Sequence, residues 1–398
     1  MIVGDLVDQG FAEIKTGPFG TQLRASDYVE SGRPVLNVRN VGFGDVRPKD
    51  LEYVDEATAS RLSSHLLRPR DIVFGRKGAV ERHAYITEKY EGAMQGSDCI
   101  RLRISDDSPI PAEFVTFALR TKQHQAWMQA FCSHGATMAS LNQDIVRQIP
   151  LPDLDRAHQE LAVAVLQNID DLIENNRRRV EVLEEMARAI YHEWFMKFHY
   201  PGHQGAPLVD SACGPIPEGW TAGTIGDALE LRYGKALKAD ARRGGDVAVV
   251  SSAGVVGWHD ESFVDGPGIV VGRKGNVGSV HWVDGPFWPI DTAYYVATEL
   301  PLRFVVEQLR RTEFANTHAA VPGLSREGAY ARPFVVPPAG VLDAFEAVVD
   351  PLGVEASALA KQSGGLASLR DLLLPKLVTG QIDVSKLDLN ALIEGQVA

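Results

Sequence analysis

One loop occurs twice in this sequence. Residues 73–87 read VFGRKGAVERHAYIT and residues 270–284 read VVGRKGNVGSVHWVD, so a Gly-Arg-Lys-Gly turn stands between two short apolar runs in both halves of the chain. The second copy begins about half a chain length after the first. Self-similarity of this kind is typical of a duplicated structural unit. The sequence therefore predicts two similar domains built from the same elements.

A second repeated stretch marks the end of each domain. Residues 134–152 read HGATMASLNQDIVRQIPLP and residues 318–338 read HAAVPGLSREGAYARPFVVPP. Each begins with His and small residues, continues from Leu141 or Leu324 into a polar segment, and ends in an apolar stretch with proline. A long helical pattern follows each copy. We therefore expect the repeated unit to be a mixed α/β domain followed by a helix.

The two helical stretches carry apolar residues at the spacings of a coiled-coil seam. The first stretch covers about residues 154–195, and its seam includes Asn176, a polar residue of the type that fixes register. In the second stretch, about residues 341–378, Pro351, Gly353, Gly364 and Gly365 predict kinks. Two single seams in one chain predict an antiparallel pair of helices. The predicted packing residues are Leu161, Val165, Ile169, Leu172, Asn176, Leu183, Ile190, Phe345, Leu352, Leu359, Leu366 and Leu373.

These patterns predict an α+β protein with two similar mixed α/β domains, separated by two long antiparallel coiled-coil helices and related by a pseudo-twofold internal repeat. Short β-branched and aromatic runs in both domains are typical of strands. Residues 199–220 are rich in Pro and Gly without periodicity, which indicates a linker. The predicted segments are domain 1 (1–152), the first spacer helix (153–198), the linker (199–220), domain 2 (221–338), the second spacer helix (339–380) and a tail (381–398).

Composition narrows the function classes. The chain has 398 residues and a net charge of −12, which argues against a protein that coats nucleic acid indiscriminately but leaves room for a local basic face. Its three cysteines are widely spaced without a CxxC pair, which indicates reduced thiols in the cytoplasm. The sequence starts without the pattern of a signal peptide, and no apolar run is long enough to span a membrane. We therefore expect a cytoplasmic protein.

Candidate binding residues cluster at the repeated loops and near the start of each domain. The glycines of the loop permit a tight turn and close approach of a large ligand, while Arg and Lys at its tip suit phosphate contact. The segments KTGPFGTQLR and LRYGKALK offer flexible backbone with polar side chains, and Arg and Asn on the following strands are residue types that read bases. The predicted DNA-binding residues are Lys15, Thr16, Gln22, Arg39, Asn40, Arg76, Lys77, Lys235, Lys238, Ser251, Arg273 and Lys274.

Catalytic and metal-binding motifs do not stand out. Pro337–Pro338 lacks the Asn or Asp and the aromatic residue of a methyltransferase strand end, and the segment Glu13–Lys15 with Asp8 gives only a faint nuclease pattern. His192, His199 and His203 lack the Cys or acidic partners of a recognised metal set. We therefore predict no catalytic residue and no metal site.

The chain resembles the specificity subunit of type I restriction–modification systems over nearly its whole length. Residues 16–46 and 233–260 resemble the openings of two target-recognition domains, residues 268–296 form the most specific single stretch, and residues 141–154 resemble the junction with the spacer helix. The second junction departs from the pattern, because residues 323–338 lack its Asn and its LPxL ending.

The resemblance implies a non-catalytic DNA-recognition subunit. Each target-recognition domain would read one half of a bipartite double-stranded DNA site, and the helices would set the gap and dock two modification subunits. The resemblance implies S-adenosylmethionine, ATP and Mg for partner subunits, with no cofactor bound by this chain. It also implies methyltransferase and restriction (translocase and endonuclease) subunits as partners.

Two other function classes remain open from the residues alone. One is a stand-alone enzyme that cleaves or methylates DNA. The other is a coiled-coil adaptor that binds no DNA, or a repressor. Turnover by the purified chain would favour the first class, and salt-dependent DNA binding that needs both loops would separate the specificity subunit from an adaptor.

Overall fold

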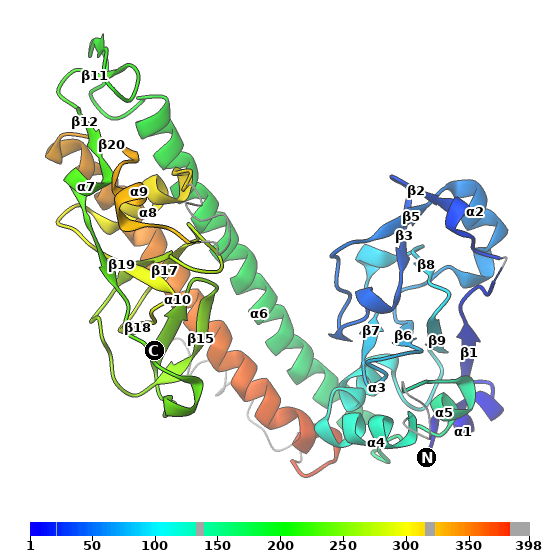
Figure 1. The fold of residues 1–398 in the computed structure, drawn as a ribbon. Helices are drawn as coiled ribbons and strands as arrows, with labels where there is room; N and C mark the ends of the chain where they lie inside the picture. The colour runs from blue at the N-terminus through cyan, green and yellow to red at the C-terminus, as the bar shows by residue number, and fades with distance from the viewer. Residues whose placement is uncertain (21, 133–138, 315–322, 383–398) are drawn as a thin grey trace. The chain divides into compact units, whose positions relative to one another are not determined.

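The computed structural model describes residues 1–20, 22–132, 139–314 and 323–382. Two compact units divide the chain (Figure 1). Unit 1 consists of Met1–Glu174 with Gly364–Ala398, and unit 2 is Asn175–Ser363. The division runs through both long helices rather than along the predicted borders of domain and helix, because each half of the helix pair packs on its own α/β domain.

The main sheet of unit 1 has the strand order β1–β9–β6–β7–β4, with antiparallel pairs except for the parallel pair β4 and β7. Strand β6 is buried along its whole length, which explains its continuous apolar sequence IVFG. The strands are β1 (Ala12–Thr16), β9 (Cys99–Ile104), β6 (Ile72–Gly75), β7 (His83–Tyr85) and β4 (Phe43–Gly44).

A smaller sheet and short helices complete unit 1. The smaller sheet has the order β2–β5–β3–β8, in which β3 and β8 are parallel. Its strands are β2 (Tyr28–Val29), β5 (Glu52–Val54), β3 (Arg33–Leu36) and β8 (Met94–Gln95). The helices are α1 (Val3–Asp8), α2 (Glu56–Arg61), α3 (Ala112–Leu119), α4 (Lys122–Cys132) and α5 (Gln143–Arg147). The largest core of the unit joins α1, the main sheet, α3, α4 and α5 to the long helices.

Unit 2 repeats this plan. Its main sheet has the order β13–β19–β16–β17, and a second sheet has the order β15–β14–β18 with β14 and β18 parallel. The strands of these sheets are β13 (Glu230–Tyr233), β19 (Ala293–Ala297), β16 (Gly268–Gly272), β17 (Val280–Val283), β15 (Gly254–His259), β14 (Val247–Ser251) and β18 (Phe287–Pro289). The helices are α7 (Ile225–Ala228), α8 (Leu302–Arg311) and α9 (Arg326–Tyr330), and β12 (Thr221–Thr224) pairs with β20 (Pro333–Val336).

The two units share one topology. In the main sheets, β1, β9, β6 and β7 correspond in order and pairing to β13, β19, β16 and β17. In the second sheets, the parallel pair β3 and β8 corresponds to β14 and β18. The α5 helix in unit 1 and the α9 helix in unit 2 both lie within the second repeated stretch. The mixed α/β class and the internal duplication predicted from the repeated loop are therefore confirmed.

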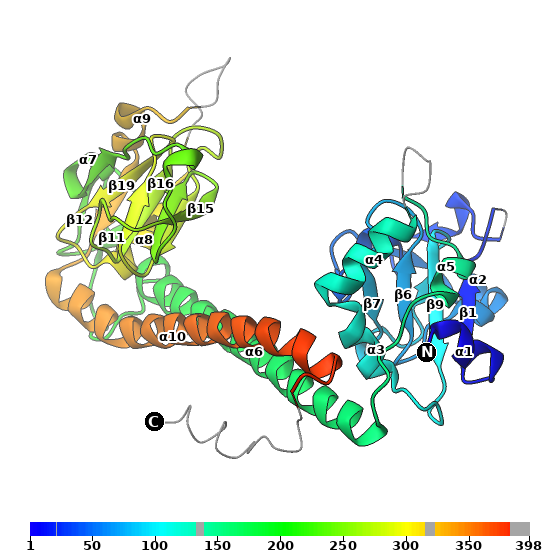
Figure 2. The same cartoon turned by 90° about the horizontal axis from the view of Figure 1, so that it is seen from below.

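Two long helices contribute to both units. They are α6 (Arg156–Tyr191), which ends in a π-helical turn over His192–Met196, and α10 (Ala339–Val378). Within each unit their segments lie side by side and antiparallel (Figure 1 and Figure 2). In unit 1 the His158 ring lies 2.9 Å from the Leu377 carbonyl oxygen, and in unit 2 the Asn176 side chain donates a hydrogen bond of 2.8 Å to Gln362.

The helix seam follows spacings of three and four residues. On α6 the inward positions are Ala162, Leu166, Ile169, Ile173, Asn176, Val180, Leu183, Ala187 and Ile190. On α10 all five residues predicted at intervals of seven, from Phe345 to Leu373, are buried or half-buried. Leu172 was assigned to the seam wrongly, since its side chain is 50% exposed. The step after Ile169 is four residues, so Ile173 turns inward instead, and Leu161 and Val165 are only half-buried beside Ala162 and Leu166.

The kinks expected in α10 stay a prediction, since the helix is continuous through Pro351 and Gly353 but no bend angle follows from its bounds. The expected linker meets different structure. Residues 199–220 form no bare linker, because they contain the hairpin of β10 (Leu208–Val209) and β11 (Ile216–Pro217), and Tyr200 and Trp220 pack into the core of unit 2. Aromatic and apolar residues among the prolines supply the buried surface. The start of each second repeated stretch (134–138 and 318–322) and the tail 383–398 lie outside the described residues.

Candidate nucleic-acid interface

The repeated loop connects the two central hairpin strands in each unit. In unit 1 it joins β6 to β7, and in unit 2 it joins β16 to β17. The second glycine of each loop, Gly78 or Gly275, has a positive φ of 79° or 80°. Residues other than glycine rarely adopt this conformation, so the shared sequence produces a shared turn. Both loops therefore present Arg and Lys at one end of the main sheet.

Three segments of unit 1 meet at its loop. The Arg76 amide donates a hydrogen bond of 2.9 Å to the Asp98 carbonyl, just before β9. The Arg76 carbonyl accepts one of 2.8 Å from the Leu141 amide, just before α5. Lys77 and Ser140 form an isolated β-bridge. The loop is thus fixed to the start of β9 and to the segment that leads into α5.

Unit 2 repeats these backbone bonds with other residues. The Arg273 amide donates to the Thr292 carbonyl at 2.9 Å, and its carbonyl accepts from the Leu324 amide at 2.8 Å. Lys274 and Gly323 form the corresponding isolated bridge. Because the same three segments meet in the same way, the residues around the two loops can be matched position by position.

One glycine in each unit is required by close packing. A Cβ atom on Gly17 would lie 1.9 Å from the Gly96 carbonyl oxygen, and one on Gly234 would lie 2.2 Å from the Ile290 carbonyl oxygen. The Gly17 amide bonds to Cys99 and the Gly234 amide to Ala293, at matching places in β9 and β19. Thr16 therefore corresponds to Tyr233, since each is the residue just before its glycine.

An aromatic ring supports the loop arginine in each unit. The Arg76 guanidinium carbon lies 5.1 Å from the ring centre of Phe19, which is 53% exposed. The Arg273 guanidinium carbon lies 5.3 Å from the ring centre of Tyr233, which is 49% exposed. Cation–π contacts of this kind hold a guanidinium in place while leaving its N–H groups accessible. The two following lysines are exposed, and Lys77 has Asp98 as a distant ionic partner at 3.8 Å.

A buried tyrosine fixes the unit 2 loop against α9. Burial raises the pKa of Tyr294 to about 12, with a further contribution from Tyr233. Its hydroxyl therefore remains protonated at neutral pH and donates a hydrogen bond of 3.0 Å to the Leu324 carbonyl. Leu324 in turn donates to the Arg273 carbonyl, so one chain of hydrogen bonds connects the sheet, the start of α9 and the loop.

The structure brings only part of the predicted set to the loops. Thr16, Arg76 and Lys77 gather in unit 1, and Arg273 and Lys274 in unit 2. Lys15 points to the other face of β1, where its charge, after burial, helps to lower the pKa of His65. Other predicted residues remain at the surface but serve local contacts, as when Gln22 accepts a hydrogen bond from the Phe19 amide and Arg39 pairs with Glu52.

Lysines of the second predicted segment lie beside the loop region of unit 2. Lys235 is exposed, and its ammonium group lies 5.4 Å from the ring centre of Trp288 and 5.9 Å from that of Phe263. Lys238 is exposed and precedes a short 3₁₀ turn. Both side chains are accessible to an anionic partner.

Two predicted DNA-binding residues were assigned wrongly. Asn40 is fully buried, and its side-chain amide donates hydrogen bonds of 3.0 Å to the carbonyls of Arg47 and Lys49. Ser251 is buried, donates to the Gly254 carbonyl and accepts from the Ala253 amide. Both polar groups satisfy the backbone of tight turns, which is a common role for Asn and Ser.

Sequence reasoning missed two residues that the fold brings to the loops. Gln143 and Arg326 are the first residues of α5 and α9, directly after the capping residues Asn142 and Ser325. Gln143 donates a hydrogen bond of 2.7 Å to the Thr16 hydroxyl, and the Arg326 guanidinium carbon lies 5.2 Å from the ring centre of Tyr233. The available signal was the pair of helix caps after Leu141 and Leu324 in the second repeated stretch.

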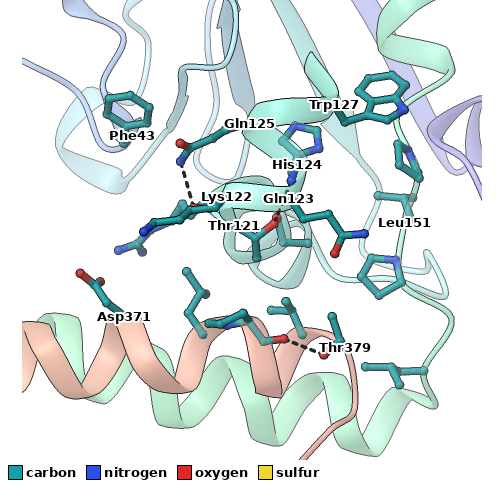
Figure 3. Close-up of a pocket in the computed structure, with 18 of the residues that line it drawn as sticks. Phe43, Thr121, Lys122, Gln123, His124, Gln125, Trp127, Leu151, Asp371 and Thr379 are labelled. Carbon is teal, nitrogen blue, oxygen red and sulfur yellow. Dashed lines mark hydrogen bonds between the residues drawn. The ribbon is translucent and has the colours of Figure 1, made fainter. Parts of the chain in front are cut away.

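A separate groove of unit 1 lies away from the loops. It has a volume of about 920 Å³ and is lined by α4, by residues 150–154 and by the last turns of α10. Figure 3 shows His124 and Trp127 on one side, with Asp371 and Thr379 on the other. A pocket of unit 2, between α8 and the long helices, has a volume of about 130 Å³.

Comparison with known proteins finds relatives and a solved structure of one kind. No family model matches the chain. The type I restriction enzyme MjaIX specificity subunit of Methanocaldococcus jannaschii is 22% identical over 309 residues, which cover 70% of this chain and 71% of that protein. Over most of its length the chain is similar to type I restriction enzyme specificity subunits.

A second specificity subunit and a solved structure of another show the same similarity. The type I restriction enzyme MjaX specificity subunit of the same organism is 22% identical over 202 residues, covering 49% of this chain and 46% of that protein. The crystal structure of the type I restriction–modification S subunit from M. genitalium has a TM-score of 0.60 at 15% identity and covers 95% of both chains. The fold of a specificity subunit therefore extends over both units. Among the described helices, none is both long and apolar enough to cross a membrane.

Proposed function

We propose that this chain is the non-catalytic, sequence-specific DNA-recognition subunit of a type I restriction–modification complex. Each unit would read one half of a bipartite double-stranded DNA site. The observation that carries the proposal is the duplicated loop, which presents Arg and Lys on the same backbone framework in both units. The similarity of the chain to a type I restriction enzyme specificity subunit supports the same role.

The charge distribution supports contact with phosphate at the loops. The chain as a whole is acidic, with a net charge of −12, so general attraction to DNA is unfavourable. Local cations still attract phosphates within a Debye length of about 10 Å at 0.1 M salt. Arg76 and Arg273 are held over aromatic rings, and Lys77 and Lys274 extend into solvent. We assign these four residues to the DNA backbone.

The antiparallel helices are proposed to set the gap between the two half-sites and to dock two modification subunits. A helix rises about 1.5 Å per residue, so the number of turns between the two units would determine the distance between the DNA segments they read. The reactions would belong to partners. Methyltransferase subunits would use S-adenosylmethionine, and restriction subunits would use ATP and Mg. Since the proposed ligand is cellular DNA, we propose a cytoplasmic location.

The proposal predicts that charge reversal at the loops weakens DNA binding. Lys77→Glu or Lys274→Glu in the full chain should raise the Kd for duplex DNA about tenfold and lower the slope of log K against log salt by about 1. The measurement is a fluorescence anisotropy titration with duplex DNA at several salt concentrations.

Lys361→Glu supplies a matched control, because Lys361 is exposed on α10 and the change in net charge is the same. Its salt slope should equal that of the unchanged chain. Equal effects of Lys274→Glu and Lys361→Glu would contradict the assignment of the loops to phosphate. Absence of any duplex binding would instead favour an adaptor without DNA contact.

A further inference from the structure

We propose that the pairs Thr16–Gln143 in unit 1 and Tyr233–Arg326 in unit 2 determine which bases each unit reads. This inference rests on the proposed function, because it assigns specificity within the DNA interface. The two pairs occupy matching positions beside the repeated loops. The side chains of the two pairs differ in chemistry, whereas the two loops have the same Gly-Arg-Lys-Gly sequence. This difference distinguishes residues that contact bases from residues that contact the DNA backbone.

The correspondence of the pairs follows from the backbone. Thr16 and Tyr233 are each the last residue of the first strand in the main sheet, directly before the closely packed Gly17 or Gly234. Gln143 and Arg326 each begin the short helix whose preceding leucine binds the loop arginine. Two independent sets of hydrogen bonds therefore place each pair at the same point of the framework.

Each pair is in contact and accessible. In unit 1, the Gln143 side chain donates a hydrogen bond of 2.7 Å to the Thr16 hydroxyl, and the Gln143 side chain is exposed. In unit 2, two guanidinium groups contact the Tyr233 ring, with Arg273 at 5.3 Å and Arg326 at 5.2 Å from its centre. The exposed edge beside each loop therefore carries an oriented side chain with unused hydrogen-bonding groups.

The contrast with the loops indicates the role of the pairs. A DNA phosphate is the same at every base pair, so two units that contact phosphate need the same cations, as the repeated Arg-Lys provides. Two half-sites of different sequence need different side chains at the base edges. Thr and Gln against Tyr and Arg meet that requirement on an otherwise matching framework.

The chemistry of each pair gives a definite expectation. A glutamine side chain forms two hydrogen bonds with adenine, and an arginine side chain forms two with guanine, in the major groove. Gln143 is therefore expected to read adenine in the half-site of unit 1, and Arg326 guanine in that of unit 2. Thr16 orients the Gln143 amide, and the Tyr233 ring orients Arg326.

Contacts of other residues already stabilise the helices α5 and α9, so the pairs are not needed to hold them in place. The Asn142 side chain caps α5 with a hydrogen bond of 2.8 Å to the Ile145 amide, and the Ser325 side chain caps α9 at 3.0 Å from the Gly328 amide. The adjacent Leu141 and Leu324 anchor these helices to the loops. Exchange of the pairs should therefore leave the fold intact.

The test transfers the unit 2 pair to unit 1. The full chain with Thr16→Tyr and Gln143→Arg, and the same chain with Gln143→Arg alone, are used to select duplexes from a random DNA library. We expect one position of the unit 1 half-site to change from adenine to guanine by about ten- to hundredfold, with the unit 2 half-site and the salt slope unchanged.

Gln148→Arg is the matched control, since it makes the same substitution at an exposed position at the end of α5. Its selected sequence should equal that of the unchanged chain. Selection of the unchanged unit 1 half-site by a folded Gln143→Arg variant would overturn the inference while leaving the proposed function in place. Failure of the unchanged chain to select any sequence would overturn the proposed function itself, and with it this inference.

Discussion

The two units share a sheet topology but attach to the long helices in different ways. In unit 2 a cluster of aromatic rings joins the domain to α6 and α10. In unit 1 aliphatic residues of both helices join the domain core, and the groove of Figure 3 lies beside them. Duplication has thus preserved the framework that carries the loops more closely than the joint behind it. The difference indicates that the framework of the loops and the joint with the long helices are under different structural requirements.

The joint of unit 2 consists of closely packed rings. Phe195 of the π-helical turn lies 4.8 Å from Phe345 of α10 and 5.0 Å from Phe304 of α8, measured between ring centres. Arg303 lies 3.8 Å above the Trp282 ring and packs against α10 at Gly353, where a Cβ atom would meet its guanidinium at 2.2 Å. Helix and domain therefore share one apolar core.

The joint of unit 1 contains one shared carboxylate. Asp170 of α6 accepts hydrogen bonds of 2.7 Å from Arg120 and 2.9 Å from Arg370. Burial alone would raise the pKa of Asp170, but the hydrogen bonds and charges of the two arginines outweigh it and lower the pKa. This network connects the end of α3 with both long helices at the edge of the groove.

The largest expected effect tests the aromatic joint. Phe345→Ala should reduce the stability of unit 2 by about 3–5 kcal/mol, because the fully buried ring leaves a cavity among three other aromatic residues. Amide hydrogen exchange resolved by unit would show the loss in unit 2. Val348→Ala on the exposed face of α10 is the control, expected within about 0.5 kcal/mol of the unchanged chain. Equal losses from both variants would mean that the ring cluster does not form the joint.

A smaller expected effect tests the ion-pair network of Asp170 in the joint of unit 1. Asp170→Asn should destabilise unit 1 by about 1–3 kcal/mol, since two partly buried guanidinium groups lose their common anionic partner. Glu355→Gln, which removes an exposed ion pair with Arg179, should cost about 0–1 kcal/mol. Thermal denaturation followed by the same exchange experiment compares the two variants. A neutral Asp170→Asn would show that apolar contacts alone hold unit 1 to its helices.

The smallest expected effect is a loss of stability at acidic pH. Burial lowers the pKa of His83 to about 3, with help from the charges of His124 and Arg120, and lowers that of His124 to about 4. Both folded-state pKa values lie below the unfolded value of 6.5, so the folded chain binds fewer protons. This stability is present above pH 6.5 and is lost as the pH falls toward the folded values.

Between pH 7 and 5.5, each histidine should therefore reduce the stability of unit 1 by about 1 kcal/mol. The measurement is hydrogen exchange of α3 and α4 across this pH range, with rates corrected for intrinsic pH dependence. His124→Gln removes one titrating group and should give a shallower dependence. A dependence as steep as that of the unchanged chain would exclude His124 as a source of acid sensitivity.

The fold was largely predictable because its signals are local or periodic. A loop written twice predicted the duplication, and five residues at intervals of seven predicted the inward face of α10. The phase of α6 was harder, since Leu161, Val165 and Leu172 are as apolar as the residues beside them. Apolar character alone cannot distinguish neighbouring positions when the spacing alternates between three and four.

The sequence predicted residues of the candidate site only where they belong to the repeated turn motif. Arg76 and Arg273 follow from the repeated loop itself. Asn40 was wrongly predicted to bind DNA, because the sequence does not distinguish an Asn that is buried and bonds to backbone carbonyls from one that faces solvent. The contact between Thr16 and Gln143 depends on pairing between strands and helices far apart in the chain, which no local pattern contains.

The buried hydrogen bond between Asn176 and Gln362 has a consequence for changes of length. If one helix slid along its neighbour by a heptad, Leu369 or Glu355 would replace Gln362 opposite the Asn176 amide. Opposite Leu369 the buried amide would lose its hydrogen bond. Sliding in the direction that brings Leu369 opposite Asn176 is therefore unfavourable after an insertion in α6 alone. Natural variants of different span would have to gain or lose turns in both helices together.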